Sequence, residues 1–276
     1  MVVAAMSQNL YRQVQRQDWI TRVVLEHGSV TIDDLVAHFK VSRMTVHRDL
    51  DDLERQGVLR KVRNGATAQP SSLFESDVRY RLPRELPEKE AICEAALAFI
   101  EPGQSVLLDE ATTLLPLARR LADLGQVTVI TNFLLILNEL SRQPSVHLVG
   151  LGGDYLPRFE TFTGLVCERA VAELHVDVFF TSTTAVHNGC AFHPEPQIVS
   201  VKRAMMAHST RRYLLADHGK FGKTALLQVA SLTDFDAVIV DDGISPAHLA
   251  AMRDAGVRVE VAPRVAVHKG SENGLP

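Results

Sequence analysis

Apolar residues recur at helical spacing along the first segment of the chain. Residues 18–27 carry one apolar stripe, and the capping-box pattern at residues 31–34 begins a second helix. A third helix is expected over residues 42–57, which open with an N-cap serine and close with a glycine. Residues 58–67 then predict a small β-hairpin, because they contain Asn-Gly, a strong two-residue turn signal.

After residue 89, short β-branched runs alternate with helical patterns. The strand candidates are residues 105–108, 127–130, 146–150, 176–181, 212–216, 237–240 and 257–261. Helical stretches between them include residues 114–124, 165–174, 198–208 and 246–255. Strands that alternate with helices form βαβ units, so we expect a Rossmann-like, mostly parallel α/β fold for this part.

The two patterns predict two domains. The helical segment with its hairpin forms a domain over residues 1–67, and the α/β domain spans residues 89–263. Between them, residues 68–88 are interrupted by prolines and serines and are expected to form a linker. The tail, residues 264–276, is expected to be disordered.

Composition excludes several classes of protein. With 46% hydrophobic and 22% charged residues, the chain of 276 residues is not a largely disordered or fibrous sequence. No apolar run approaches the ~20 residues that cross a bilayer, and the start lacks the pattern of a signal peptide. Three widely spaced cysteines argue against a disulfide scaffold, so we expect a cytoplasmic protein without a membrane partner.

Charge is divided unequally between the two segments. Residues 1–68 hold ten Lys and Arg against eight Asp and Glu, whereas the remainder is acidic and brings the whole chain to −4. Three cations, Arg60, Lys61 and Arg63, lie close together in the predicted hairpin. This asymmetry predicts different partners for the two domains.

The third helix has the pattern of a DNA-recognition helix. Its apolar residues share one face, so the polar and cationic side chains near its N-terminus point outward, as a major groove requires. Ser42 is expected to cap the helix and to contact phosphate. The hairpin would act as a wing against the sugar-phosphate backbone. The candidate DNA contacts are Ser42, Arg43, Met44, Thr45, His47, Arg48, Arg60, Lys61 and Arg63.

A helical bundle with a solvated charged face is the simpler alternative to DNA binding. The acidic residues of the third helix argue mildly for that alternative. We expect two of them, Asp49 and Asp52, to turn sideways towards protein partners.

Polar or glycine residues follow three successive predicted strands of the second domain. They are residues 109–113 (Asp-Glu-Ala-Thr-Thr), Thr131-Asn132 and Gly152-Gly153. Phosphate sites on α/β sheets lie at the carboxyl ends of strands, where loops and helix N-termini present N–H groups. The three loops together therefore predict a binding site for a phosphorylated ligand.

The first segment carries a resemblance to a known family. Residues 41–50 (Val-Ser-Arg-Met-Thr-Val-His-Arg-Asp-Leu), Leu53-Glu54 and residues 57–60 resemble the winged-helix signature of DeoR-family bacterial regulators of sugar metabolism. The family has arginine where this chain has His47, and a different wing sequence from residues 61–66. These departures leave the fold intact but alter which base or phosphate is touched, so the family's operator sequence is not carried over.

The resemblance extends through much of residues 89–261 and implies a sensor domain similar in fold to ribose-5-phosphate isomerase. It implies that Asp109 contacts sugar hydroxyls and that Lys220 supplies a cation to an anionic effector. The effector-binding residues that it implies are Asp109, Thr112, Thr113, Thr131, Asn132, Gly152, Gly153, Asp217 and Lys220. Glu195 and Lys202 could pair with each other or face the ligand.

Two loops of the sensor domain depart from the family pattern. Ala111 replaces a glycine in the phosphate loop, and residues 181–185 replace a loop that usually contains glycine. Both departures leave the identity of the effector open.

Together these observations predict a transcriptional repressor of a carbohydrate-catabolism operon, released from operator DNA by a phosphorylated sugar or polyol. Since a single winged helix makes few base contacts, a homodimer or homotetramer is expected. No cofactor and no catalytic residue are expected.

Two alternatives compete with this prediction. A sugar-phosphate isomerase-like enzyme would use carboxylates and a lysine, for which Asp109, Glu110, Asp217 and Lys220 are of the right types. A metal-responsive regulator would use His187, Cys190 and His193, whose side chains bind zinc or copper in other proteins.

Overall fold

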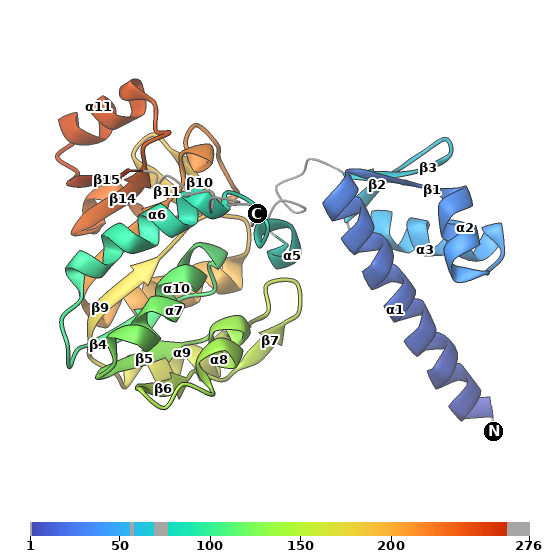
Figure 1. Ribbon diagram of the computed structural model, residues 1–276, viewed down its shortest axis with the longest axis horizontal. Coiled ribbons are helices and arrows are strands. Elements are labelled where there is room, and N and C mark those ends of the chain that lie inside the picture. Colours follow the sequence, from blue (N-terminus) through green and yellow to red (C-terminus); the bar gives the residue numbers. More distant parts are fainter. Residues whose placement is uncertain (1, 56–57, 69–76, 264–276) are drawn as a thin grey trace, which may run out of the picture. The chain divides into compact units, whose positions relative to one another are not determined.

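The computed structural model describes residues 2–55, 58–68 and 77–263 of the chain (Figure 1). Residues 69–76 of the predicted linker and the predicted tail, 264–276, lie outside the described residues. The chain forms two compact units, Met1–Arg84 and Glu85–Pro276.

The first unit contains the three predicted helices and the predicted hairpin. Its elements are α1 (Val2–His27), β1 (Ser29–Thr31), α2 (Ile32–Phe39), α3 (Arg43–Arg55), β2 (Leu59–Val62), β3 (Gly65–Ala68) and α5 (Val78–Arg81). Strands β2 and β3 form the wing, and β1 pairs with β3, so the antiparallel order is β1-β3-β2. This is a winged helix-turn-helix. The sequence pattern predicted its elements except the short β1 and α5, and α1 begins at Val2 rather than near residue 18.

Periodic apolar residues of all three helices and the wing meet in one core. The buried members are Ile20, Val24, Val30, Ile32, Leu35, Val46, Leu50, Leu53, Leu59 and Ala66. The Thr31 hydroxyl caps α2 by accepting the Asp34 N–H at 3.1 Å, as the capping-box pattern predicts. Gly65 is required by close packing, because a Cβ there would lie 2.0 Å from the Val30 carbonyl oxygen on the neighbouring β1.

Regular structure extends into the segment 68–88 that the sequence predicts as a linker. Asp77 caps the short α5 by accepting the Arg79 N–H at 2.9 Å, and α6 (Leu86–Ala96) begins within the same segment. Pro87 lies in the first turn of α6, where a missing N–H costs no helical hydrogen bond. Pro87, which interrupts the sequence pattern of the predicted linker, therefore marks the start of α6.

The second unit is built on a parallel sheet of seven strands. They are β4 (Ser105–Leu108), β5 (Val127–Thr131), β6 (Val146–Gly150), β9 (Val176–Thr181), β12 (Ser209–Ala216), β14 (Ala237–Asp241) and β15 (Val259–Ala262). Their order in the sheet is β15-β14-β12-β9-β4-β5-β6, with every neighbouring pair parallel. The predicted Rossmann-like α/β fold is confirmed.

Helices connect these strands. They are η1 (Leu97–Phe99), η2 (Thr112–Leu114), α7 (Leu115–Leu124), α8 (Leu134–Leu140), α9 (Gly164–Ala172), α10 (Pro196–Ala207), η3 (His218–Lys220), η4 (Leu232–Asp234) and α11 (Pro246–Asp254). The order of the central strands places the carboxyl ends of β4, β9 and β12 side by side, where ligands bind in open α/β sheets.

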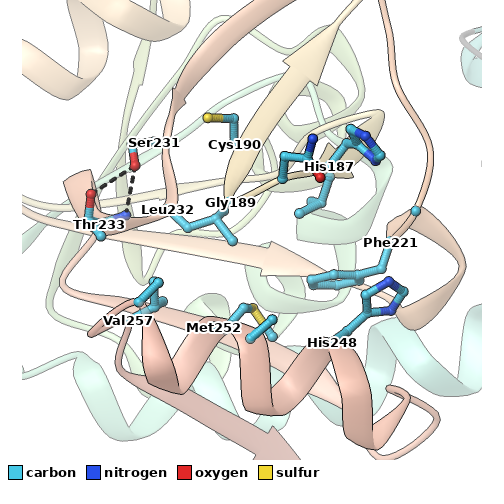
Figure 2. A pocket seen from close by; sticks show the side chains of 15 residues that line it. His187, Gly189, Cys190, Phe221, Ser231, Leu232, Thr233, His248, Met252 and Val257 are labelled. Atoms are coloured by element: carbon cyan, nitrogen blue, oxygen red, sulfur yellow. Dashed lines mark hydrogen bonds between the residues drawn. The ribbon is translucent and has the colours of Figure 1, made fainter.

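Two antiparallel additions lie outside the main sheet. One is the hairpin of β7 (Asp154–Leu156) and β8 (Thr161–Thr163); the other is a three-stranded sheet of β10 (Ala185–His187), β11 (Cys190–His193) and β13 (Leu227–Ser231). The second addition, together with η4 and α11, lines a cavity of about 450 Å³ (Figure 2). These antiparallel strands do not belong to the alternation of strands and helices that predicts the main sheet.

Candidate functional site

The outward face of α3 presents the side chains that the sequence assigned to DNA. Ser42 caps the helix, because its hydroxyl oxygen accepts the Thr45 N–H at 3.1 Å. Arg43, Met44 and Arg48 are exposed, whereas Thr45 and His47 are half-buried. The apolar side of α3 packs into the core, so the helix keeps this face open to solvent.

The acidic residues of α3 are held by the same chain. The buried Asp49 carboxylate pairs with the Arg16 guanidinium, with Nη2 donating to Oδ1 at 3.0 Å. Asp52 accepts hydrogen bonds from Gln13 and Gln17 at 2.9 and 3.3 Å. The prediction that Asp49 and Asp52 face protein partners is therefore wrong. Both side chains contact α1, and these contacts hold the recognition helix in place.

The wing presents two of its three cations freely to solvent. Arg60 and Arg63 are exposed, but the Lys61 side chain is 24% exposed and pairs with Asp51 on α3. Lys61 also donates its backbone N–H to Glu54 at 2.7 Å. The hydrogen bond from Lys61 lowers the pKa of Asp51. Lys61 thus ties the wing to the recognition helix in addition to adding charge.

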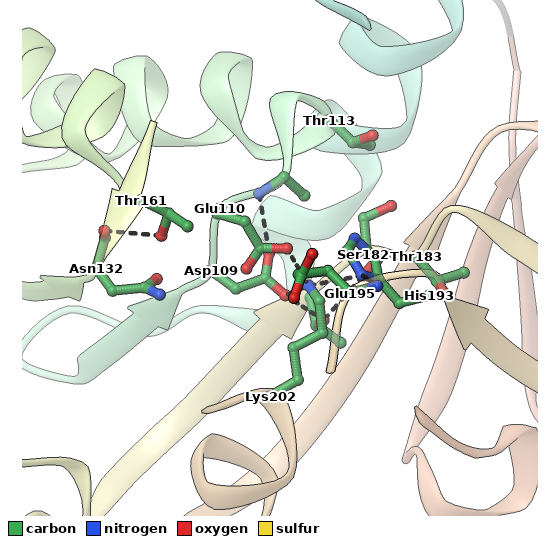
Figure 3. A network of polar contacts seen from close by, with 12 residues as sticks. Asp109, Glu110, Thr113, Asn132, Thr161, Ser182, Thr183, His193, Glu195 and Lys202 are labelled. Atoms are coloured by element: carbon green, nitrogen blue, oxygen red, sulfur yellow. Dashed lines mark hydrogen bonds and ion pairs between the residues drawn. The ribbon is translucent and has the colours of Figure 1, made fainter. Parts of the chain in front are cut away.

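A buried polar network lies at the carboxyl ends of β4 and β9 (Figure 3). Its centre is Lys202 of α10, which is 1% exposed. The Lys202 ammonium pairs with Asp109 and, at 2.9 Å, with Glu110, and donates to the Ser182 carbonyl at 3.1 Å. The Thr181 hydroxyl also donates to Asp109. Lys202, which the sequence left between two roles, is bound to the Asp109 loop.

Burial and the neighbouring charges shift the pKa values of this network in opposite directions. Burial lowers the pKa of Lys202, but the two carboxylates outweigh it and hold that pKa above its ordinary value. Burial raises the pKa of Glu110, and the attraction of Lys202 does not cancel it. The Lys202 ammonium pairs with both buried carboxyl groups, so the network orders the loop that follows β4.

Lys220 contacts two of the other predicted effector residues, Thr113 and Asp217, and also Ser182. Its ammonium donates to the Thr113 hydroxyl at 3.0 Å and to the Ser182 hydroxyl at 2.7 Å, and pairs with Asp217 at 3.3 Å. Burial raises the pKa of Asp217, but Lys220 and the other positive charges outweigh it and leave that pKa lowered. Loops after β4, β9 and β12 thus converge on a single cation, although the strand-end argument had indicated only the first of these three loops.

The loop after β5 contributes Asn132, whose side chain lacks one hydrogen-bond partner within the described chain. The Thr131 hydroxyl accepts the Phe133 N–H at 3.1 Å, so this threonine is occupied in ordering the loop. Asn132 is buried and donates to the Phe162 carbonyl at 2.8 Å, while its Oδ1 makes no hydrogen bond within the described chain. A buried acceptor without a donor is costly unless a ligand or water satisfies it.

Gly152 and Gly153 differ in what surrounds them. A Cβ at Gly153 would lie 2.3 Å from the Thr163 carbonyl oxygen, and φ is +148°. At Gly152 no atom lies within 4 Å of that position. Packing against β8 therefore explains Gly153, and open space remains only at Gly152.

Ser182 is a contact of the site that the sequence did not assign. Its carbonyl accepts from Lys202 and its hydroxyl accepts from Lys220. The available signal is its place directly after β9, at the end of a fourth predicted strand. Thr112 is buried at the start of η2, beside Thr113.

His187, Cys190 and His193 are not brought together as a metal site. His187 and Cys190 face each other across the β10–β11 hairpin and line the cavity of Figure 2. His193 is buried, and its Nδ1 accepts the Glu195 N–H at 3.1 Å in the network of Figure 3. The geometry gives the metal-sensor alternative no support.

Within the described ranges, only Glu88, His218 and Asp241 bring three potential ligand atoms within 4.8 Å of one another. Asp241 there already accepts hydrogen bonds at 2.7 Å from the backbone N–H and from Nδ1 of His218. Internal hydrogen bonding accounts for this cluster. Among the residues that the structure describes, no helix is both long and apolar enough to span a bilayer.

A winged helix-turn-helix unit followed by an α/β unit is the architecture of a two-domain transcription regulator. The DeoR-like helix-turn-helix domain matches residues 16–72, and the DeoR C terminal sensor domain matches residues 84–242. The chain belongs to the DeoR family of transcriptional regulators.

Curated relatives are similar over most of the chain. The transcriptional repressor AccR of Agrobacterium fabrum is 32% identical over 83% of this chain and 89% of its own length. The lactose phosphotransferase system repressor of Staphylococcus epidermidis is 31% identical over 82% of this chain and 91% of its own. Both relatives are named as regulators and neither as an enzyme.

A solved structure of ribose 5-phosphate isomerase from Methanocaldococcus jannaschii matches 48% of this chain and 53% of its own. The TM-score is 0.35 with 16% identity, a likeness too distant to bear on activity.

Proposed function

We propose that this protein represses a carbohydrate-catabolism operon and leaves its operator when a phosphorylated sugar or polyol binds the second unit. The observation that carries the effector assignment is the convergence of Thr113, Ser182 and Asp217 on the Lys220 ammonium. The names of the relatives support the repressor assignment. The outward face of α3 and the wing would bind the operator.

The contacts of Lys220 suggest how an anionic ligand is held. The ammonium is shared among two hydroxyls and one carboxylate, so a dianionic phosphate would compete for it. Thr112 and Thr113 would supply hydroxyl and backbone N–H donors at the start of η2. The unsatisfied Oδ1 of Asn132 would accept a hydroxyl of the sugar or polyol.

Asp109 would position the loop that follows β4 instead of contacting the sugar hydroxyls, the role that the family resemblance implies for it. It is fully buried and already accepts from the Lys202 ammonium, the Thr181 hydroxyl and, at 3.1 Å, the Ala111 N–H. A carboxylate with these three donors is better suited to shaping the phosphate loop than to touching sugar hydroxyls. Lys202 would act with Asp109 in holding that loop.

The switch requires that effector and DNA favour different arrangements of the protein. A preference of about 2.7 kcal/mol for one arrangement would change operator affinity about a hundredfold. Because one winged helix makes few base contacts, the operator-bound form is expected to be a dimer or tetramer on paired half-sites.

Lys220→Ala is expected to abolish the response to the effector while operator binding is retained. A thermal-shift screen of phosphorylated sugars and polyols should find a compound that, at about 100 times its Kd, stabilises the wild type by about 2.7 kcal/mol. The variant should lose that shift, because the cation that meets the phosphate is gone. Unphosphorylated counterparts of the same compounds should give little or no shift.

Lys223→Ala is the matched control, since Lys223 is an exposed lysine three residues along the same loop. It should keep the wild-type shift. If no phosphorylated compound shifts the wild type, or if Lys220→Ala responds as the wild type does, the effector site is misassigned.

Wing substitutions are expected to alter the salt dependence of DNA binding unequally. Log K falls with log salt, and each phosphate contact adds about 0.9 to the steepness of that fall. Arg60→Ala and Arg63→Ala should therefore each make the slope shallower by about 1 per bound copy. Lys61→Ala should change the slope less, because Lys61 is paired with Asp51. Fluorescence anisotropy of promoter DNA over a range of salt concentrations measures these slopes. Equal slopes for the wild type and all three variants would show that the wing does not contact DNA phosphates.

A further inference from the structure

Met44 is the one large apolar side chain of α3 that does not join the core. Its exposed fraction is 73%, whereas Val46, Leu50 and Leu53 of the same helix are buried. A single exposed apolar residue is ordinary on a protein surface. The position of Met44 makes it informative, because it lies in the first turn of the recognition helix.

Several polar neighbours of Met44 are engaged within the protein. Arg43 pairs with Asp33 at 2.8 Å, and the Thr45 hydroxyl is hydrogen-bonded to Ser42 at 2.9 Å. Arg48 is exposed and follows Met44 by four residues, which places the two side chains on one side of the helix. This side therefore presents one long apolar group next to one long cation.

The major groove offers a specific partner for each group. Arginine reads the O6 and N7 acceptors of guanine, and the 5-methyl group of thymine is the apolar feature of the base edges. Four residues of helix rise about 6 Å, close to two base-pair steps of about 3.4 Å. We infer that Arg48 reads a guanine and that Met44 contacts the 5-methyl group of a thymine within about two base pairs of that guanine. This inference rests on the proposed binding of operator DNA by α3.

Replacement of thymine by uracil tests the contact, because it removes only the methyl group. Full-length protein is first used to select binding sites from a random duplex pool, and each thymine of the selected site is then replaced by deoxyuridine. Wild-type affinity should fall about fourfold at one thymine per half-site, the equivalent of one buried methyl group. Met44→Ala should bind the two duplexes equally, and Met44→Leu should keep most of the difference.

Val14→Ala is the matched control, since Val14 is an exposed apolar residue of α1, outside the recognition helix and the wing. It should leave the thymine-to-uracil ratio at the wild-type value. The inference is overturned if no uracil substitution weakens wild-type binding, or if the same ratio persists in Met44→Ala. If selection enriches no sequence at all, the proposal of DNA binding fails as well, so the two failures are distinguishable.

Discussion

Lys202→Met is expected to lower the free energy of unfolding of the second unit by about 3–5 kcal/mol, because it leaves Asp109 and Glu110 buried without their cation. For a unit of this size the melting temperature should fall on the order of 10 °C. Urea unfolding and calorimetry measure the two quantities. Arg119→Ala, which breaks an exposed pair with Glu139, should cost less than about 1 kcal/mol. An equally small effect for Lys202→Met would show that the network is not structural.

The penalty of Lys202→Met should also depend on pH. Burial raises the pKa of Glu110 above its ordinary value of 4.5, and loss of the lysine removes an opposing influence. A carboxyl group with a raised folded pKa adds stability that is present below its unfolded pKa and lost as pH rises through the folded pKa. The variant should therefore be less destabilised at about pH 5 than at about pH 8. A penalty that grows on acidification would contradict this assignment of charge.

Arg48→Ala is expected to remove specific operator binding while the thermal shift with effector is kept. One arginine–guanine contact is worth about 1–3 kcal/mol, or about 5- to 150-fold in affinity for each bound copy. Two copies on paired half-sites multiply the loss, so the variant should bind promoter DNA no better than unrelated DNA. Anisotropy with both duplexes measures the ratio.

Arg55→Ala supplies the control for Arg48→Ala. Arg55 is an exposed arginine at the other end of α3, paired with Asp52, and its loss should change operator affinity little. If Arg48→Ala lost DNA binding and effector binding together, and Lys220→Ala did the same, the assignment of the two functions to separate units would be wrong.

Local patterns in the sequence predicted most of the first unit. Helical periodicity and caps placed α2, α3 and the wing, because these signals come from neighbouring residues. The strand β1 was missed, since three residues carry no usable alternation. Pro87 was interpreted as an interruption, although the first turn of a helix tolerates proline as well as a linker does.

The candidate effector site was predictable only in part. The rule for strand ends indicated Thr113 as part of the site, whereas Asp217 and Lys220 were assigned only through the resemblance to the DeoR family. The strand-end rule could not predict that Lys202 pairs with Asp109, because the two residues are separated by 93 positions in the sequence. Likewise, nothing in the wing sequence indicates that Lys61 reaches Asp51, since that pairing depends on how β2 packs on α3.

Ser182 is a direct link between Lys202 and Lys220: its carbonyl accepts from Lys202, and its hydroxyl, which donates to the Leu215 carbonyl, accepts from Lys220. An anion that draws the Lys220 ammonium away would leave this hydroxyl with one partner fewer. Ligand binding at Lys220 would then alter the hydrogen bonds of the segment between β9 and β10, although that segment does not contact the ligand. Ser182 is thus one of three side chains through which a change at Lys220 would reach the surrounding loops.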